Sequence, residues 1–520
     1  MVVIALAQVL LIFNISTLQV SIEGIVYSFN APATVVGTAI VTYTLVVAGF
    51  IMPGAKLGQK LGSRRVFRFT ALLFGAAMAL MMLSRGVVAL ILAQVIAGVA
   101  AAAMVPTLVV LIADNYQGDR QEKALGWLAG ATPLGIVLAF LIAGGLATWI
   151  GWRFTFGFLT GLSVVIYMLG NKLKPVQGRA SNGLDAGGTV LAAVAVFLIS
   201  FGANNLTQWG TLLATPHAPF SVLDMSPAPI MIVCGLFLMQ AFFSWSYRRS
   251  ARGKAPLIAL EVLESSKELS AVFCLFIVGA LGSAITFLVP LYMQVVLGRS
   301  ELQTAVAVIP YSFASFASAV FVVRLYGRFS PRRLARYAFL LLTVGVSLLG
   351  SVVRNDWGTF TVVISMALAG LGEGALMTLL FNVLVSASPK SLAGDVGSLR
   401  GVANNLASGV GTAVASALMV GMLGTIVHRE LADNPVIPNE LKMEINLDRI
   451  PFISNRQLRS TLTRTTAPQE YVAEAERINT HARLVALKIS FFTLAGLALL
   501  AFFPAGGLPD YVAGEVSSGG

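Results

Sequence analysis

Long apolar segments separated by short polar connections fill most of this chain. Crossing the hydrocarbon core of a bilayer takes about 20 residues of helix, and each segment is close to that length or longer. The segments are Val2–Val26, Val35–Gly54, Val66–Ser84, Val88–Ile112, Ala124–Ala147, Trp152–Leu169, Gly187–Leu206, Pro229–Tyr247, Leu269–Tyr292, Thr304–Val323, Ala335–Val353, Phe360–Val385, Val402–Val427 and Leu484–Phe503. The pattern predicts an all-α membrane protein with fourteen transmembrane helices.

The composition excludes an ordinary soluble domain. Of the 520 residues, 57% are hydrophobic and only 11% are charged, whereas soluble domains carry about 25% charged residues. Lys and Arg (35) outnumber Asp and Glu (23), a balance that also occurs in proteins that bind nucleic acid. Here the basic residues lie in short loops beside apolar segments, as the positive-inside rule predicts. We therefore expect a lipid bilayer, and no nucleic acid, as the partner.

The connection between the second and third segments is a short basic turn, Pro53–Phe67. It contains Lys56, Lys60, Arg64 and Arg65 and no acidic residue. Basic residues also follow the sixth, eighth and tenth segments, whereas the alternate short connections carry few. Because basic loops stay in the cytoplasm, this alternation predicts that both termini are cytoplasmic.

Two features indicate an internal repeat. Arg328–Leu334 matches Lys60–Val66 in charge and order, and Ala369–Gly372 resembles Ala97–Ala100. The last six segments then repeat the first six, and the seventh and eighth are an inserted pair. Parallel repeats of this kind are typical of alternating access, with the substrate near the bilayer midplane.

The repeat sets the predicted domain boundaries. A first six-helix bundle covers residues 1–170, and the inserted helix pair with its cytoplasmic linkers covers 171–268. A second six-helix bundle covers 269–506 and includes a long periplasmic loop, 428–483, before a cytoplasmic tail at 507–520. Long loops cross the membrane regardless of charge. Two interpretations of the loop stay open, a cover over the outer face and a docking surface for a periplasmic partner.

Glu373 is the strongest candidate for a functional side chain. It lies midway along its apolar segment between small residues, and an ionisable group at that depth indicates function by default. It is a candidate proton carrier or counter-charge for a cationic substrate; the alternative is a structural carboxyl hydrogen-bonded across a helix contact. Glu23, near the outer end of the first segment, is the second acid, with an interfacial carboxyl as the alternative.

Several uncharged side chains are further candidates. Polar contacts in a substrate cavity are predicted for Asn14, Gln19, Gln94, Gln294 and Asn382. The alternative for each is a hydrogen bond between helices, worth about 1 kcal/mol. In the fifth segment Gly130, Pro133 and Gly135 are expected to allow close packing and bending. Arg64 and Arg65 are candidates to pair with Asp114 as a cytoplasmic latch.

The chain shows no catalytic constellation. His217, His428 and His481 lie in predicted outer loops, without Cys or acidic neighbours at the spacing of metal ligands. No glycine-rich loop precedes a Lys-Ser/Thr pair, which argues against direct use of ATP. We therefore expect neither an enzyme nor a resident metal or cofactor.

Four stretches resemble the major facilitator superfamily, in particular its fourteen-helix drug:proton antiporter branch. The basic turn, with Gly54, Lys60, Gly62, Arg64 and Arg65, is similar to the family's signature loop. Ala97–Pro106 in the fourth segment, Gly126–Gly145 in the fifth and Pro290–Gly298 at the end of the ninth are similar to other motifs of this branch. The resemblance implies a multidrug efflux type of secondary transporter in the inner membrane, exporting hydrophobic or cationic small molecules in exchange for protons.

The chain departs from the family at three charged positions. Gln59 replaces an aspartate of the signature loop, Asn14 an aspartate of the first helix, and Gln94 an arginine linked to proton coupling. Amides keep hydrogen bonding but do not titrate. Two alternatives therefore stay open. One is a lipid or amphiphile transporter, or a uniporter, without the usual coupling; the other is a non-transporting receptor or assembly partner that acts through residues 428–483.

Overall fold

The protein was analysed as a computed structural model. It describes residues 2–21, 25, 28–29, 34–173, 185–210, 212–216, 218–254, 256–257, 265–297, 301–354, 359–388, 392–432, 434–437, 455, 458–459 and 468–510. The helices in this part of the chain are α1 (Val2–Val20), α3 (Thr34–Leu61), α4 (Ser63–Leu83), α5 (Val87–Asn115), α6 (Asp119–Trp149), α7 (Trp152–Leu169), α8 (Ala186–Trp209), α9 (Pro227–Ala251), α10 (Ser266–Leu291), α11 (Glu301–Phe321), α12 (Pro331–Val352), α13 (Thr359–Ala387), α14 (Ala393–Ala432) and α17 (Gln469–Leu500).

Each predicted segment corresponds to one of these helices. Within the described ranges, 13 helices are long and apolar enough to cross a membrane, and α1 adds a shorter apolar stretch, Val2–Leu18. The all-α membrane architecture predicted from the sequence is therefore confirmed.

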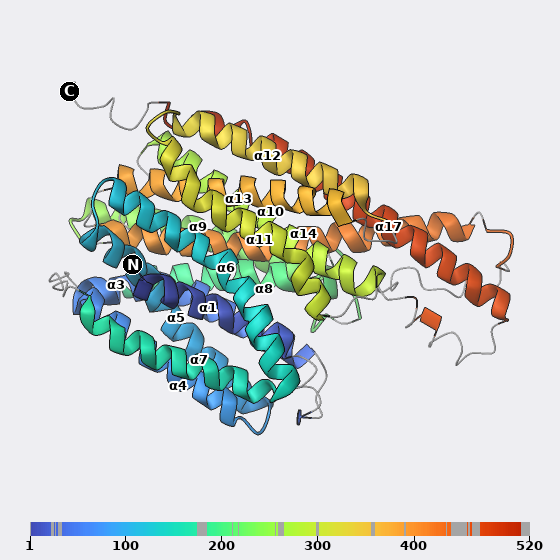
Figure 1. Ribbon diagram of the computed structural model, residues 1–520, viewed down its shortest axis with the longest axis horizontal. Helices are drawn as coiled ribbons and strands as arrows, with labels where there is room; N and C mark the ends of the chain where they lie inside the picture. The colour runs from blue at the N-terminus through green and yellow to red at the C-terminus, as the bar shows by residue number, and fades with distance from the viewer. Residues whose placement is uncertain are drawn as a thin grey trace.

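The helices lie side by side along the long axis of the molecule (Figure 1). Helices α1 and α3 to α7 pack mainly on one another, and so do α10 to α14 with α17. We call these the first and second helix groups. Helices α8 and α9 pack against each other, and α8 also contacts α3 and α14, so that it touches both groups. The residue limits predicted for the domains stay a prediction.

The two copies of the basic turn begin a helix in different ways. Gly62 separates α3 from α4 with a φ of 91°, a backbone conformation that glycine adopts without steric cost. In the second copy Ser330 precedes α12 and Pro331 is its first residue, where the missing N–H of proline is tolerated. We call the end of the molecule that carries both turns the basic end.

The last described residues also lie at the basic end. Asp510 accepts a hydrogen bond from the Ser330 hydroxyl at 2.7 Å and pairs with Arg332 at 3.0 Å. The hydrogen bond from Ser330, together with Arg332, lowers the pKa of the Asp510 carboxyl below its ordinary value. The C-terminal segment is thereby tied to the turn that begins α12.

Two helices extend farther than the sequence predicted. The loop was expected to begin at His428 and the membrane helix after it at Leu484, with helical character already in Ala467–Arg483. In the structure α14 continues to Ala432, and α17 runs without a break from Gln469. At 1.5 Å per residue α14 is about 60 Å long, about twice the thickness of a hydrocarbon core. Figure 1 shows α14 and α17 running past the other helices at the end opposite the basic turns. We call this part the extension.

A buried arginine holds the extension together. Arg483 on α17 is 1% exposed and donates hydrogen bonds to the carbonyl of Asn479 at 3.2 Å and to Oδ1 of Asn455 at 2.7 Å. The side chain of Asn479 donates to the same Oδ1 atom at 2.8 Å. Residue 455 of the predicted loop is therefore fixed to α17.

We expect Arg483→Met to loosen the extension. The change removes one of the two donors to Oδ1 of the half-buried Asn455, and a hydrogen bond to a charged group is worth about 1.5–3 kcal/mol. Amide hydrogen exchange at residue 455 and at residues 479–483 of α17 should accelerate. The matched control is Arg477→Met, whose exposed pair with Glu474 is worth about 0–1 kcal/mol. Equal exchange rates in the two variants would contradict the role of Arg483.

Candidate functional site

The Glu373 carboxyl lies where three helices of the second group meet. Glu373 is near the middle of α13, and its Oε1 atom points at Gly282 of α10 so closely that a methyl group added there would collide with it. The hydroxyl of Tyr311, on α11, also lies near this carboxyl, close enough to interact with it but without the geometry of a regular hydrogen bond. The carboxyl is thus held between a helix backbone and a phenol.

Small residues bring α13 close enough to its neighbours to create this arrangement. Gly370 faces the backbone of Tyr311, and Gly374 faces the backbone of Ser315, both on α11. On another side of α13, a methyl group at Gly372 would lie 2.6 Å from the Ala338 carbonyl of α12. Small residues allow this close approach of helices in membranes. The residues around Glu373 therefore fix where its side chain can go.

Gly282 offers a steric test of this arrangement. Gly282→Ala should push the Glu373 side chain out of its position, because the new methyl group overlaps Oε1. We expect the variant to be made and folded but to lose most of its transport activity, measured as substrate uptake per molecule of protein in membrane vesicles. Gly161→Ala is the matched control, since nothing lies within 4 Å of a methyl group at that position. Equal activity of the two variants would show that Glu373 tolerates displacement.

The first helix group contains a neutral polar pair at the contact between α1 and α5. Asn14 donates to Oε1 of Gln94 at 2.9 Å, and Gln94 donates back to Oδ1 of Asn14 at 3.4 Å. Both side chains are fully buried. Each amide donates to the other across the helix contact, and neither has a titratable proton.

The glycines of helix α6 face two different neighbouring helices. Gly126 and Gly130 face α11 of the second group, where an added methyl group would lie 2.9 Å from the Ala319 carbonyl or from the Phe316 ring. Gly135, beyond Pro133 in the same helix, faces α1, where an added methyl group would lie 3.4 Å from Cα of Val9. Gly130 therefore lies at the contact between the groups, whereas Gly135 lies inside the first.

An ion pair joins the two groups at the basic end. Lys56 on α3 donates to both carboxylate oxygens of Asp395, near the start of α14, at 3.0 and 3.1 Å. The Asp395 side chain is 1% exposed and that of Lys56 17%. Close packing continues beside the pair, because Gly397 of α14 lies against Val109 of α5 and Gly401 against Ile51 of α3. We call the Lys56–Asp395 contact the interbundle ion pair.

The rest of the basic turn packs within the first group. Gly54 lies against the backbone of α5, and Arg64 donates to the carbonyl of Asn171 at 2.7 Å. Lys60, Arg65 and Asp114 are exposed, and Asp114 has an interaction of its own. A latch between Arg64 or Arg65 and Asp114 stays a prediction.

The remaining predicted site residues are not brought together with Glu373 by any described contact. Asn382 lies nine positions farther along α13 and donates to the Tyr326 hydroxyl at 3.0 Å. Glu23 falls outside the described residues, and the side chains of Gln19 and Gln294 are likewise not described. Gly282, Tyr311 and Asp395 were missed by the sequence analysis, because no local pattern marks them.

Among the residues that the structure describes, no group of three or more His, Cys, Asp or Glu side chains could hold a metal ion. His481 of the extension pairs instead with Glu430 of α14.

Comparison with known proteins identifies the fold that carries these contacts. The Major Facilitator Superfamily pattern matches residues 4–412. This chain belongs to the Major Facilitator Superfamily. It is a transporter rather than an enzyme, as expected.

Two bacterial relatives indicate the branch of this Major Facilitator Superfamily member. The chain is 27% identical to the "Probable actinorhodin transporter" of Streptomyces coelicolor, over 78% of this chain and 71% of the relative. It is 24% identical to the "Multidrug efflux pump LfrA" of Mycolicibacterium smegmatis, over 83% and 82%. The recognition of an efflux-type relative of this superfamily is thereby confirmed.

Solved structures agree on the fold. The proton:xylose symporter XylE superimposes with a TM-score of 0.59 at 13% identity, covering 96% of this chain and 93% of the symporter. The human organic anion transporter MFSD10 gives a TM-score of 0.56 at 14% identity, covering 97% and 98%. At these identities the likeness is evidence for the fold alone.

Proposed function

We propose that this chain exports hydrophobic or cationic small molecules from the cell, in exchange for protons carried by Glu373. The observation that carries the proposal is the carboxyl of Glu373 at mid-helix, held against Gly282 and Tyr311. The names of the relatives, which include an antibiotic transporter and a multidrug efflux pump, support the substrate class.

Competition at one carboxyl explains how the exchange would work. The carboxylate attracts a cationic substrate, and a proton that binds the same group cancels that attraction. Substrate and proton therefore exclude each other on Glu373, which couples their movements. The neutral Asn14–Gln94 pair cannot take this role, so the proposal places the coupling in the second helix group.

The proposal places the chain in the inner membrane with its basic end facing the cytoplasm. Positively charged loops are retained in the cytoplasm. The interbundle ion pair and the contacts of Gly126 and Gly130 then close the cytoplasmic side. Alternating access would break these contacts when the substrate enters from the cytoplasm, and re-form them when it leaves.

Dye transport into inverted membrane vesicles tests the proposal. The vesicle lumen is acidified while valinomycin and potassium hold the membrane potential at zero, so that a cationic dye such as ethidium has no electrical reason to accumulate. We expect dye uptake that requires the chain and stops when an uncoupler collapses the pH gradient. Uptake that ignores the gradient would contradict proton exchange. Absence of uptake would favour lipid transport or a partner role for the extension.

A further inference from the structure

A cavity with one polar wall lies at the basic end, away from Glu373. It measures about 140 Å³ and opens between α10, α13, the turn before α12 and the first turns of α6. Asn382 in its wall is nine residues beyond Glu373, about 13 Å along the helix axis. Residues from both helix groups line the cavity, because Glu122 belongs to α6 and Asn382 to α13.

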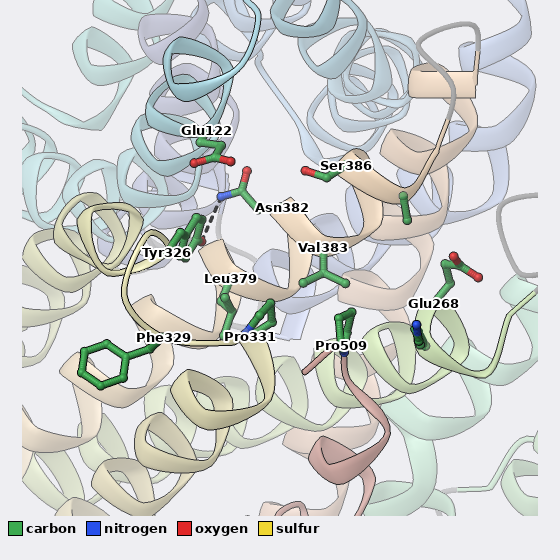
Figure 2. A pocket seen from close by; sticks show the side chains of 12 residues that line it. Glu122, Glu268, Tyr326, Phe329, Pro331, Leu379, Asn382, Val383, Ser386 and Pro509 are labelled. Carbon is green, nitrogen blue, oxygen red and sulfur yellow. Dashed lines mark hydrogen bonds between the residues drawn. The ribbon is translucent and has the colours of Figure 1, made fainter. Parts of the chain in front are cut away.

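The polar wall of this cavity offers acceptors. Asn382 is 4% exposed, and its amide nitrogen is used by the hydrogen bond to Tyr326. Its Oδ1 atom is buried and has no hydrogen-bond partner within the described part of the chain. Figure 2 shows the Glu122 carboxyl and the Ser386 hydroxyl gathered with this amide on the same side of the cavity. A buried acceptor without a donor is costly, so this wall suits a ligand that donates hydrogen bonds.

The charge of the lining favours a cation. Its charged residues are Glu122, Glu268 and Lys267, two acids and one base, which leaves one negative charge at an end of the molecule where the turns are basic. Glu268 accepts the backbone N–H of Ser265 at 2.7 Å to cap α10. Figure 2 shows the Glu122 carboxyl beside the Asn382 amide, whereas the Glu268 carboxyl lies on the far side of the cavity.

The opposite wall is apolar. Leu379, Val383 and Pro509 cover it, and apolar atoms provide most of the lining. A ligand that fills the cavity thus needs a donor-bearing positive group at one end and a hydrophobic body at the other.

We propose that this cavity binds the ammonium group of an amphiphilic amine. The N–H groups donate to the Glu122 carboxylate and to Oδ1 of Asn382, and the hydrophobic body lies against Leu379 and Val383. The proposal rests on the export function, since it makes the cavity the place where a cationic substrate first binds from the cytoplasmic side. The ligand would contact both helix groups before it reaches Glu373.

Equilibrium binding of dansylcadaverine, a fluorescent hydrophobic amine, to the purified full chain tests the proposal. Measurements in a Glu373→Gln background remove the central carboxyl, so that binding reports on the cavity. Adding Glu122→Gln is expected to weaken binding about tenfold or more, because a charge-assisted hydrogen bond is lost. Adding Glu470→Gln, an exposed residue at the start of α17, should change nothing. The neutral dansyl pentylamide should bind weakly to every variant.

Two outcomes overturn the proposal: amine binding that is unchanged by Glu122→Gln, or a neutral amide that binds as tightly as the amine. If Glu122→Gln does not elute as a monodisperse protein, Asn382→Leu decides instead, and it must weaken the amine and not the amide. Binding is measured without transport, so the two proposals fail separately. Glu122-dependent binding without dye uptake in vesicles would refute export alone, whereas uptake with Glu122-independent binding would refute the cavity alone.

Discussion

Glu373→Gln is expected to abolish the uptake that a pH gradient drives. Exchange of labelled for unlabelled substrate across the membrane should persist. Glutamine has the size and hydrogen-bonding capacity of glutamate but cannot carry a proton. The packing of α13 against Gly282 and Tyr311 is therefore preserved, whereas the negative charge and its titration are lost. Uptake in acidified vesicles should fall to the level of vesicles without the chain.

Two measurements make this result specific. Glu470→Gln, at the exposed start of α17, is the matched control and should behave as wild type. Exchange of labelled for unlabelled substrate without a pH gradient should persist in Glu373→Gln, which shows that the variant is folded and still binds. A Glu373→Gln protein that accumulates dye at the wild-type rate would exclude this carboxyl from coupling.

Breaking the interbundle ion pair is expected to open the basic end. Lys56→Ala takes the lysine partner away from the buried Asp395, and removing one member of a buried pair costs about 3–5 kcal/mol. The 17% exposure of Lys56 and the further interaction of Asp395 place the effect at the lower end. That cost falls on the closed conformation, where the two groups meet, and so raises the population of the open one.

A cysteine at position 398 reports the opening. Ser398 on α14 is 1% exposed in the structure, where the ion pair is formed. Ser398→Cys should therefore react slowly with a maleimide, in a chain whose exposed Cys234 is replaced by serine. Lys56→Ala should accelerate labelling at least about tenfold, since a shift of 1.4 kcal/mol already changes a population ratio tenfold. Lys60→Ala, an exposed neighbour one helical turn away, is the control. The charge-swapped double variant, Lys56→Asp with Asp395→Lys, should restore slow labelling. If Lys56→Ala does not accelerate labelling and the double variant does not restore it, the interbundle ion pair does not hold the basic end closed.

Features that depend on local pattern could be predicted from the sequence. Apolar length marks the helices, and the small residues around Glu373 mark a carboxyl in a tight helix contact. Its contacts could not be predicted, because Gly282 and Tyr311 lie on other helices and bear no local signal. The same holds for Asp395, which is 339 positions from Lys56 in the sequence.

The start of α17 differs from the predicted membrane segment for another physical reason. Hydropathy detects helices only where lipid surrounds them, so the charged first turns of α17, with Glu470, Glu474 and Arg477, were assigned to a loop. Their helical character was indicated by acidic residues placed ahead of basic ones. Residue 455 could not be connected to Arg483, since that contact again joins distant parts of the chain.

The most direct test of the central claim is proton release on substrate binding. Purified protein in weakly buffered detergent solution is mixed with a saturating cationic dye, and a pH indicator follows the protons set free. If substrate and proton compete for Glu373, the wild type releases protons and Glu373→Gln binds the dye without releasing any. Equal release by both proteins, or dye binding to the wild type with no release, would contradict the account.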